Sequence, residues 1–163
     1  MDSKPGIGSE FYFTITLPVC TELFAAENDV VEIEEEKLRG LNVLLAEDND
    51  LNAEIAVALM EIKGIRVDRA IDGQQAVEIF EQSPLETYNV ILMDINMPVK
   101  NGLVAAMEIR ALGRPDAATV PILAMTANTF QEDRESAAKA GMTGFLPKPF
   151  DIGQLYQLLL DSK

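Results

Sequence analysis

Residues 42–48 have the sequence NVLLAED, and residues 88–94 have the sequence YNVILMD. In each stretch a short apolar run ends at acidic side chains, which are Glu47 and Asp48 in the first and Asp94 in the second. Short apolar runs of this kind are typical of strands buried on both faces of a parallel sheet. Because the carboxyl ends of parallel strands meet at one edge of a sheet, these three acids are expected to converge.

Two later runs follow the same pattern and add a hydroxyl and an amine to this edge. The first ends at Thr126, and the second is followed by Lys148. Between the runs apolar residues recur at helical spacing, and one more short strand is expected nearer an edge. The expected strands are 42–46, 65–70, 88–93, 120–125 and 144–147, and the expected helices are 50–63, 73–83, 102–112, 130–140 and 151–160. Gly113 and Pro115 are expected to close the third helix, and Asp151 is expected to cap the fifth.

Five strand-helix pairs joined by short loops predict an α/β fold, because parallel strands need crossover connections and these are right-handed. The expected architecture is a flavodoxin-like, doubly wound sheet of five parallel strands in the order 2-1-3-4-5, between two layers of helices. In this order, ligands bind beyond the carboxyl ends of the strands, at the switch between the first and third strands. These are the two strands that carry the three acids.

The expected edge combines three carboxylates with a lysine. Like charges about 4 Å apart repel by about 4 kcal/mol at an effective dielectric of about 20, so the carboxylates need a counter-cation. Hard oxygen ligands suit Mg²⁺, with Mn²⁺ as the other candidate. Asp94 is the candidate nucleophile for a phosphoryl group whose oxygens Lys148 and Thr126 would hold. An open alternative is that Asp48 or Asn49 only caps the first helix.

The composition argues against several other functions. The chain has 163 residues, 48% of them apolar, and its formal charge of −14 disfavours nucleic acid and anionic membranes as direct partners. It contains no histidine, so a phosphoryl group carried on histidine must come from another molecule or from a segment outside this sequence. The single cysteine, Cys20, and the lack of a run of about 20 apolar residues predict a cytoplasmic chain. Any membrane anchor of a parent protein is expected outside this sequence.

Four motifs together resemble the receiver domain of two-component response regulators. They are residues 44–49 (LLAEDN), 92–98 (LMDINMP), 125–127 (MTA) and 145–150 (FLPKPF). The resemblance extends over residues 41–161. It implies that Asp94 is the phosphoacceptor, that Asp48 binds Mg²⁺ directly and that Glu47 acts largely through water.

The resemblance also implies roles for four further residues. The main-chain carbonyl of Asn96 would complete the magnesium shell. Thr126 and Phe145 would form the switch pair, in which the hydroxyl moves toward the phosphoryl group and the ring turns inward behind it. Asn96 and Asn128 occupy the two positions that tune the lifetime of the phosphoaspartate in this family.

Two local details accompany these motifs. Asn101 stands before Gly102 where the family usually has an acid, a departure that bears on partner preference. Lys148 lies between two prolines, and a cis bond between Lys148 and Pro149 is predicted.

The first forty residues have a different character. Residues 1–18 combine a glycine turn at 6–9 with a strand pattern at 11–17, and they resemble the last glycine box and final strand of a histidine kinase ATP-binding domain. Residues 19–40 are acidic and are expected to form a solvated linker, which leaves 41–163 as the receiver domain. Residues 47–52 (EDNDLN) are similar to receivers attached to hybrid sensor histidine kinases.

The expected partner is therefore the phosphohistidine domain of a histidine kinase, or a histidine phosphotransfer protein. This segment is not by itself a complete enzyme, and its expected parent is a histidine protein kinase. On the first helix, Ala56 and Leu59 are candidate partner contacts, with burial in the core as the alternative. Rival functions are a Mg²⁺-dependent phosphatase with an aspartyl nucleophile, a docking module that is never phosphorylated, and a flavin module, whose phosphate Glu47 and Asp48 would repel.

Overall fold

The computed structural model describes residues 2–4, 8–10, 35–126, 131–149 and 151–162. The chain divides into two compact units, Met1–Val31 and Glu32–Lys163. Among the described residues, no helix is both long and apolar enough to cross a bilayer.

The first unit contains an antiparallel pair of short strands, β1 (Asp2–Lys4) and β2 (Gly8–Glu10). The glycine turn was predicted to include Gly8 and Ser9, but both residues belong to β2, and β1 was not predicted. The strand predicted at 11–17 lies outside the described residues.

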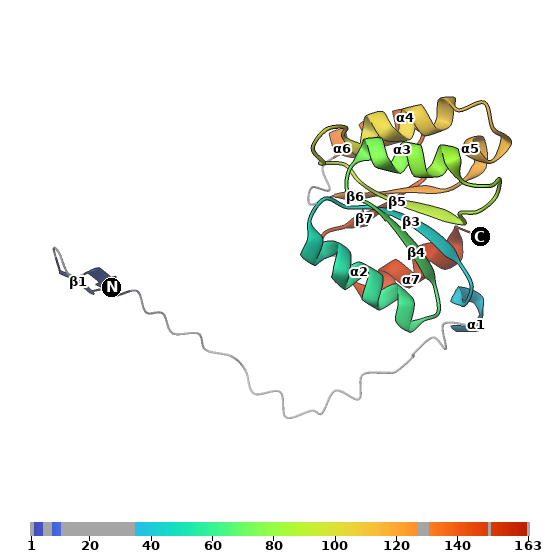
Figure 1. Cartoon of the computed structure of the whole chain (residues 1–163). Coiled ribbons are helices and arrows are strands. Elements are labelled where there is room, and N and C mark those ends of the chain that lie inside the picture. Colours follow the sequence, from blue (N-terminus) through green and yellow to red (C-terminus); the bar gives the residue numbers. More distant parts are fainter. Residues whose placement is uncertain (1, 5–7, 11–34, 127–130, 150, 163) are drawn as a thin grey trace. The chain divides into compact units, whose positions relative to one another are not determined.

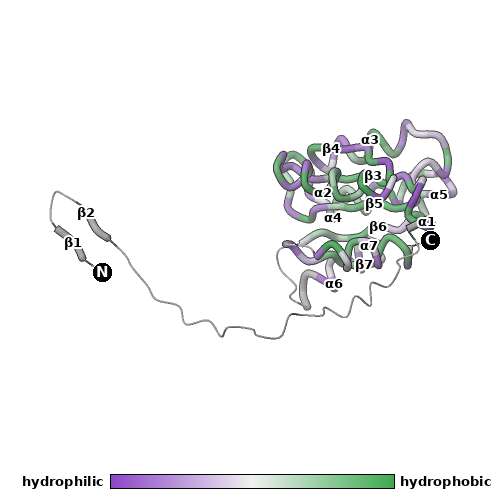
Figure 2. The backbone as a smooth tube through the Cα atoms, turned by 90° about the horizontal axis from the view of Figure 1, so that it is seen from below, coloured by the Kyte–Doolittle hydropathy of each residue, from purple (hydrophilic) through white to green (hydrophobic). Residues whose placement is uncertain are grey.

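The second unit is built on a sheet of five parallel strands in the order β4-β3-β5-β6-β7. In chain order this is 2-1-3-4-5, so the predicted flavodoxin-like topology is confirmed. β5 and β6 are buried at every position, whereas the edge strand β4 is partly exposed, and the tube in Figure 2 is correspondingly hydrophobic through the sheet centre. The strands are β3 (Asn42–Ala46), β4 (Arg66–Ala70), β5 (Val90–Asp94), β6 (Ile122–Thr126) and β7 (Gly144–Pro147).

Helices cover both faces of the sheet (Figure 1). One face of the sheet is covered by α1, α2 and α7, and the other by α3, α4, α5 and α6. A separate buried apolar cluster lies between the sheet and each of these two layers of helices. Alternate residues of β3 and β5 supply the two clusters, as the pleat of a strand requires. The helices are α1 (Glu35–Leu38), α2 (Asp50–Ile62), α3 (Gly73–Gln82), α4 (Gly102–Ala111), α5 (Pro115–Thr119), α6 (Gln131–Lys139) and α7 (Ile152–Asp161).

Polar caps explain why the predicted helix starts are close to those observed. The side chains of Asn49, Asp72, Asn101 and Asp151 each accept a hydrogen bond from a main-chain N–H in the first turn of the helix that follows. Such a cap satisfies one of the donors that every helix start leaves open. The four helices with these caps therefore begin at the predicted residue or one residue after it. The predicted start of the remaining helix, at 130, lies outside the described residues, and α6 begins at Gln131.

Two helices were not predicted. Pro115 was interpreted as closing the helix before it, but it is the first residue of α5, a position that suits its fixed φ and missing donor. α1 lies within the stretch expected to be linker, yet its Leu38 is fully buried against the cluster under α2 and α7. The last turn before β3 is thus part of the packed domain.

Arg114 and Asp116 tie α5 to the end of α3. The Arg114 guanidinium donates to the main-chain carbonyls of Glu81 at 3.0 Å and Ser83 at 3.1 Å, where the helix leaves carbonyls without partners. Asp116 accepts from Arg114 Nε at 2.7 Å and from the Glu86 N–H at 2.8 Å. These hydrogen bonds hold the pKa of Asp116 at about 2, below its ordinary 3.8, mainly through Arg114.

Asp116→Asn is expected to lower the free energy of unfolding by about 2 kcal/mol at pH 7, because the depressed pKa measures how far the fold favours the carboxylate. That stability is complete above the unfolded pKa near 3.8 and is lost as the pH falls through the folded pKa of about 2. Urea unfolding of both proteins between pH 7 and pH 2 should therefore show the difference shrinking below about pH 4.

Asp161→Asn is the matched control, since Asp161 is exposed at the end of α7 and its change should stay within about 0.5 kcal/mol. Equal stability of Asp116→Asn and the parent protein at pH 7 would show that the Arg114 contact contributes nothing.

Candidate functional site

The carboxyl edge of the sheet gathers the three predicted acids. One carboxylate oxygen from each of Glu47, Asp48 and Asp94 lies within 4.8 Å of the other two. β3 and β5 are neighbours in register, with Ala46 opposite Met93, so the residues that follow them reach the same edge. Three carboxylate oxygens at this spacing match the ligands that Mg²⁺ prefers, so the donor set fits a magnesium ion.

The start of α2 decides which residue caps the helix and which faces the edge. Asn49 is the cap, since its side-chain oxygen accepts from the Asn52 N–H at 3.1 Å. Asp48 is exposed and belongs to the acidic cluster. The alternative that Asp48 serves only as a helix cap is therefore excluded.

Lys148 lies among the acids, although it follows β7 and is 101 residues away from Glu47. Its Nζ donates to Glu47 Oε2 and, at 2.6 Å, to Asp94 Oδ2. Its main-chain N–H donates to the Thr126 carbonyl at 2.7 Å, which attaches the residue to the end of β6. The Lys148–Pro149 peptide bond is cis, as predicted.

Asp94 and Lys148 both have shifted pKa values. Burial raises the pKa of Asp94, and the hydrogen bonds from Lys148 and from the Asn96 N–H at 3.0 Å oppose that rise only in part. Burial alone would lower the pKa of Lys148, but its hydrogen bonds to Asp94 and Glu47 outweigh burial and raise it. The surroundings of Asp94 thus disfavour its charged form, and a further cation would stabilise that form.

The loop after β5 is packed closely against Asp94. The Gly102 N–H donates to the Ile95 carbonyl at 3.0 Å, and a Cβ on Gly102 would lie 2.1 Å from the Asp94 carbonyl oxygen. Asn101, the residue that departs from the family pattern, caps α4 by accepting from Val104 N–H at 2.9 Å. Amide and acid side chains both serve as caps, so this departure keeps the local structure intact.

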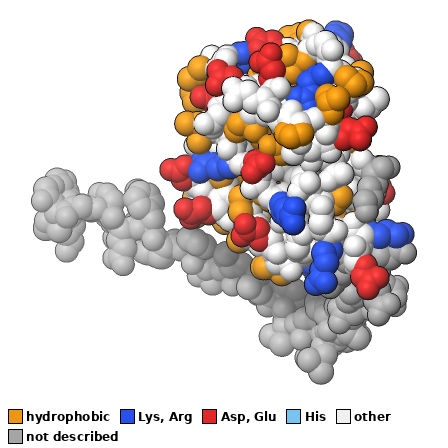
Figure 3. Space-filling model, turned by 45° about the vertical axis from the view of Figure 1, so that its right-hand side comes forward, with side chains coloured by type: hydrophobic (Ala, Val, Ile, Leu, Met, Phe, Trp, Pro, Cys, Tyr) orange, Lys and Arg blue, Asp and Glu red, His pale blue; other side chains and the backbone are white. Residues whose placement is uncertain are grey.

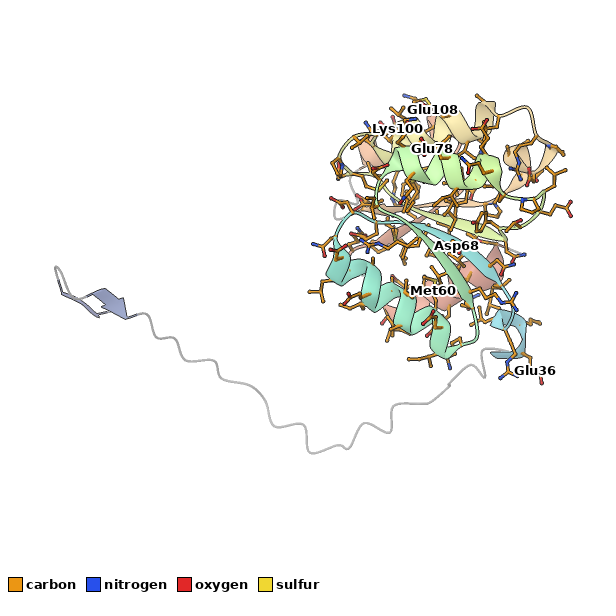
Figure 4. All side chains as sticks on the ribbon, in the orientation of Figure 1. Glu36, Met60, Asp68, Glu78, Lys100 and Glu108 are labelled. Carbon is orange, nitrogen blue, oxygen red and sulfur yellow. The ribbon has the colours of Figure 1, made fainter. Side chains whose placement is uncertain are left out.

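Lys100 in the same loop pairs with Glu108 on α4, and the two side chains lie side by side in Figure 4. The Gly73 N–H donates to the Lys100 carbonyl at 3.1 Å, so the loop is also attached to the first residue of α3. Contacts on both sides therefore hold the segment that follows Asp94.

The remaining predicted site residues lie along β6 and β7. Thr126 is buried at the end of β6, which places it at the same edge as Asp94. Phe145 on β7 is half-buried against the cluster under α3 and α4, with the Arg134 guanidinium 5.5 Å from its ring centre. Asn96 is exposed beside Asp94, and Asn128 lies outside the described residues.

Two side chains that hold the acidic loop were not assigned a role from the sequence. Asn52 Nδ2 donates to Glu47 Oε1 at 3.1 Å. Arg69, on the edge strand β4, donates to the main-chain carbonyl of Glu47 and to Asp50. Asn52 has a sequence signal, because it belongs to the pattern at 47–52 that resembles hybrid-type receivers. A lone arginine in an alternating strand has none.

The structure separates Ala56 and Leu59, the two candidate partner contacts on α2. Ala56 is buried against the sheet, as is Met60 (Figure 4), so for Ala56 the alternative of burial in the core holds. Leu59 is half-buried, and its contact with a partner stays a prediction. The apolar side chains that α2 exposes near the acidic edge are Leu51 and Ile55, at 65% and 48% of their full areas.

Comparison with known proteins identifies the family. Residues 43–160 match the response regulator receiver domain. Aerobic respiration control sensor protein ArcB of Escherichia coli is 34% identical over 158 residues, which are 96% of this chain and 19% of ArcB. The chain spans between 8% and 19% of the length of the curated relatives to which it is similar.

Solved structures agree with this match. The receiver domain of the Pseudomonas aeruginosa sensor histidine kinase PA1611, which has a magnesium ion in its active-site cleft, is 41% identical, with a TM-score of 0.68 over 75% of this chain and 96% of that chain. A chain in the co-crystal of the Saccharomyces cerevisiae phosphotransfer protein Ypd1 with the receiver domain of Ssk1 is 31% identical, with a TM-score of 0.67 over 73% and 86%. The fold, the acidic edge and these matches together show that this chain belongs to the response regulator receiver domains of two-component signal transduction.

Proposed function

We propose that Asp94 is the phosphoacceptor of this domain and that it takes its phosphoryl group from a phosphohistidine on a partner. The observation that supports this most strongly is the convergence of Glu47, Asp48 and Asp94 with Lys148 at one edge of the sheet. Of the three acids, Asp94 stands at the end of the fully buried central strand and makes the hydrogen bonds expected of a fixed nucleophile.

Glu47, Asp48, Asp94 and the Asn96 carbonyl would hold Mg²⁺ or Mn²⁺ at this edge. When bound, the ion supplies positive charge that offsets the repulsion among the acids and the charge on the phosphoryl oxygens. The ion in the PA1611 receiver supports the same assignment here.

In the reaction an Asp94 carboxylate oxygen forms a bond to phosphorus while the bond from phosphorus to the histidine nitrogen breaks, and the bonding pair stays on the imidazole. Lys148 is already 2.6 Å from Asp94 Oδ2, so its ammonium is placed to pair with the transferred oxygens. Thr126 would donate its hydroxyl to one of those oxygens. Movement of Thr126 and Phe145 would then carry the change to the surface near β6 and α7.

The partner is proposed to be a histidine-bearing protein, because this chain contains no histidine. A receiver in complex with the phosphotransfer protein Ypd1 is among the similar structures. Leu51 and Ile55 on α2, exposed beside the acidic edge, are the residues we propose to contact it. On the face seen in Figure 3, acidic and basic side chains are interspersed rather than forming a broad basic surface, in keeping with a protein partner rather than nucleic acid.

The parent protein is proposed to be a cytoplasmic or membrane-anchored hybrid histidine kinase. The match to ArcB includes 96% of this chain and so extends before residue 43, where the receiver match begins. This extension supports residues 1–18 as the end of a kinase ATP-binding domain, followed by a linker and the receiver. Of the linker expected at 19–40, α1 packs with the receiver.

Incubation with acetyl phosphate and MgCl₂ tests this function. One phosphoryl group per chain is expected, detected as an increase in intact mass, and EDTA should prevent it because the acids need their cation to approach the anionic donor. Equal labelling in EDTA would contradict the magnesium site. Release of many phosphate ions per chain, without accumulation of a phosphorylated form, would favour the phosphatase alternative.

A further inference from the structure

Arg69 lies at the end of the edge strand β4, next to the loop that carries two of the three acids. In the β3–β4 pairing Arg69 is opposite Leu45, and the Glu47 N–H continues the ladder by donating to the Ala70 carbonyl at 3.0 Å. The next peptide of the loop has no strand beside it. The Arg69 side chain therefore lies where the sheet stops holding the chain and the acidic loop begins.

The guanidinium binds both ends of that loop. Arg69 Nη2 and Nε donate to the main-chain carbonyl of Glu47 at 3.2 and 3.4 Å, and Nη2 donates to Asp50 Oδ1 at 2.7 Å. Asp48 lies between these two attachment points. A planar guanidinium with several fixed donors suits this bridge, because it can hold a carbonyl and a carboxylate at once.

Arg69 does not use the carboxylates of Glu47, Asp48 or Asp94 in these contacts. The carboxylate partner of Arg69 is Asp50, which is not part of the acidic cluster. Lys148 differs, because it donates directly to Glu47 and Asp94 within the cluster. Arg69 thus orients the loop from behind, through its main chain.

We propose that Arg69 is a positioning residue that sets the Glu47–Asp48 peptide so that both carboxylates face the metal site. This inference rests on the proposed function, because it needs a magnesium ion at the acidic edge. Groups that orient metal ligands typically change metal affinity by about 10- to 100-fold when they are removed.

Magnesium titration of the whole chain tests the proposal, because two explanations predict changes of opposite sign. If Arg69 acts only through its charge, Arg69→Ala removes repulsion against the cation and Mg²⁺ binds more tightly. If Arg69 positions the loop, Arg69→Ala weakens Mg²⁺ binding, and we expect the Kd to rise about 10-fold. Isothermal titration with MgCl₂, at a temperature at which both proteins are folded by circular dichroism, distinguishes the two signs.

Arg66→Ala is the matched control. Arg66 is exposed at the other end of β4, where it pairs with Asn42 of β3. The Arg66→Ala substitution therefore removes the same charge from the same strand. Its Kd for Mg²⁺ should stay within about twofold of the parent value. Arg69→Lys should recover part of the affinity, because an ammonium keeps the charge but lacks the planar fork that binds two acceptors.

A double-mutant cycle with Asp50 completes the test. Asp50→Ala should weaken Mg²⁺ binding by itself, because Asp50 holds the guanidinium, and it should add less than about twofold when Arg69 is already alanine. An unchanged or lower Kd in Arg69→Ala would overturn the positioning role while the magnesium site stands. Absence of Mg²⁺ binding by the parent protein would instead overturn the proposed function itself.

Discussion

Asp94→Asn is expected to reduce phosphate incorporation from acetyl phosphate to background, the largest functional effect of any single change in this domain. An amide of the same shape keeps the side chain in place but is too weak a nucleophile to form a bond to phosphorus. Intact-mass measurement after incubation with acetyl phosphate and MgCl₂ reads the result directly. Persistence of the added phosphoryl group in Asp94→Asn would mean that another residue is the acceptor.

Loss of folding is not a competing explanation for that result. Burial raises the pKa of Asp94, so its charged form costs stability at pH 7 and its neutral replacement should leave the unfolding midpoint unchanged or higher. Lys148 keeps Glu47 as a partner in the variant. Asp161→Asn, the same chemical change at the exposed end of α7, should be labelled as fully as the parent protein.

Gly102→Ala is expected to destabilise the domain by about 3 kcal/mol, the largest effect on stability among these variants. The new Cβ would lie 2.1 Å from the Asp94 carbonyl oxygen and 2.8 Å from Met93 Cγ. Rotation of a side chain cannot relieve the first of these clashes, because that oxygen belongs to the main chain. Helix propensity predicts the opposite sign, since alanine is preferred to glycine by about 1 kcal/mol inside a helix. Urea unfolding of the variant therefore decides between close packing and intrinsic preference.

Gly113→Ala provides the control for that measurement. A Cβ on Gly113 would meet nothing within 4 Å. Gly113→Ala should therefore leave the free energy of unfolding unchanged or raise it by at most about 1 kcal/mol. Similar stabilities of Gly102→Ala and Gly113→Ala would show that the segment after Asp94 can shift to accommodate the new Cβ at little cost. A large difference would show that the start of α4 is fixed against the acceptor strand.

The features that sequence reasoning predicted best are those encoded by nearby residues. The apolar runs before Asp48 and Asp94 predicted the strands, and right-handed crossovers then determined the strand order. That order brought together acids from different strands, which the structure places within 4.8 Å of one another. Asp151 as a cap and the cis bond before Pro149 are local signals of the same kind, and both are present.

The features that were missed depend on packing between distant segments. Arg69 reaches the Glu47 carbonyl only because β4 happens to end beside the acidic loop, and nothing near either residue signals the contact. Ala56 was a wrong candidate for partner contact, because an apolar helical pattern does not reveal which small residues the sheet covers. α5 was missed because a proline after a glycine usually closes a helix, but here it begins one.

Chemical identification of the modified residue tests most directly whether Asp94 accepts the phosphoryl group. Borohydride reduces an acyl phosphate to an alcohol, so treatment of the protein phosphorylated by acetyl phosphate converts the acceptor aspartate into homoserine. Peptide mass spectrometry is then expected to find homoserine at position 94 and unmodified aspartate at position 48. Homoserine at position 48, or a reduced residue anywhere else with Asp94 intact, would contradict the assignment.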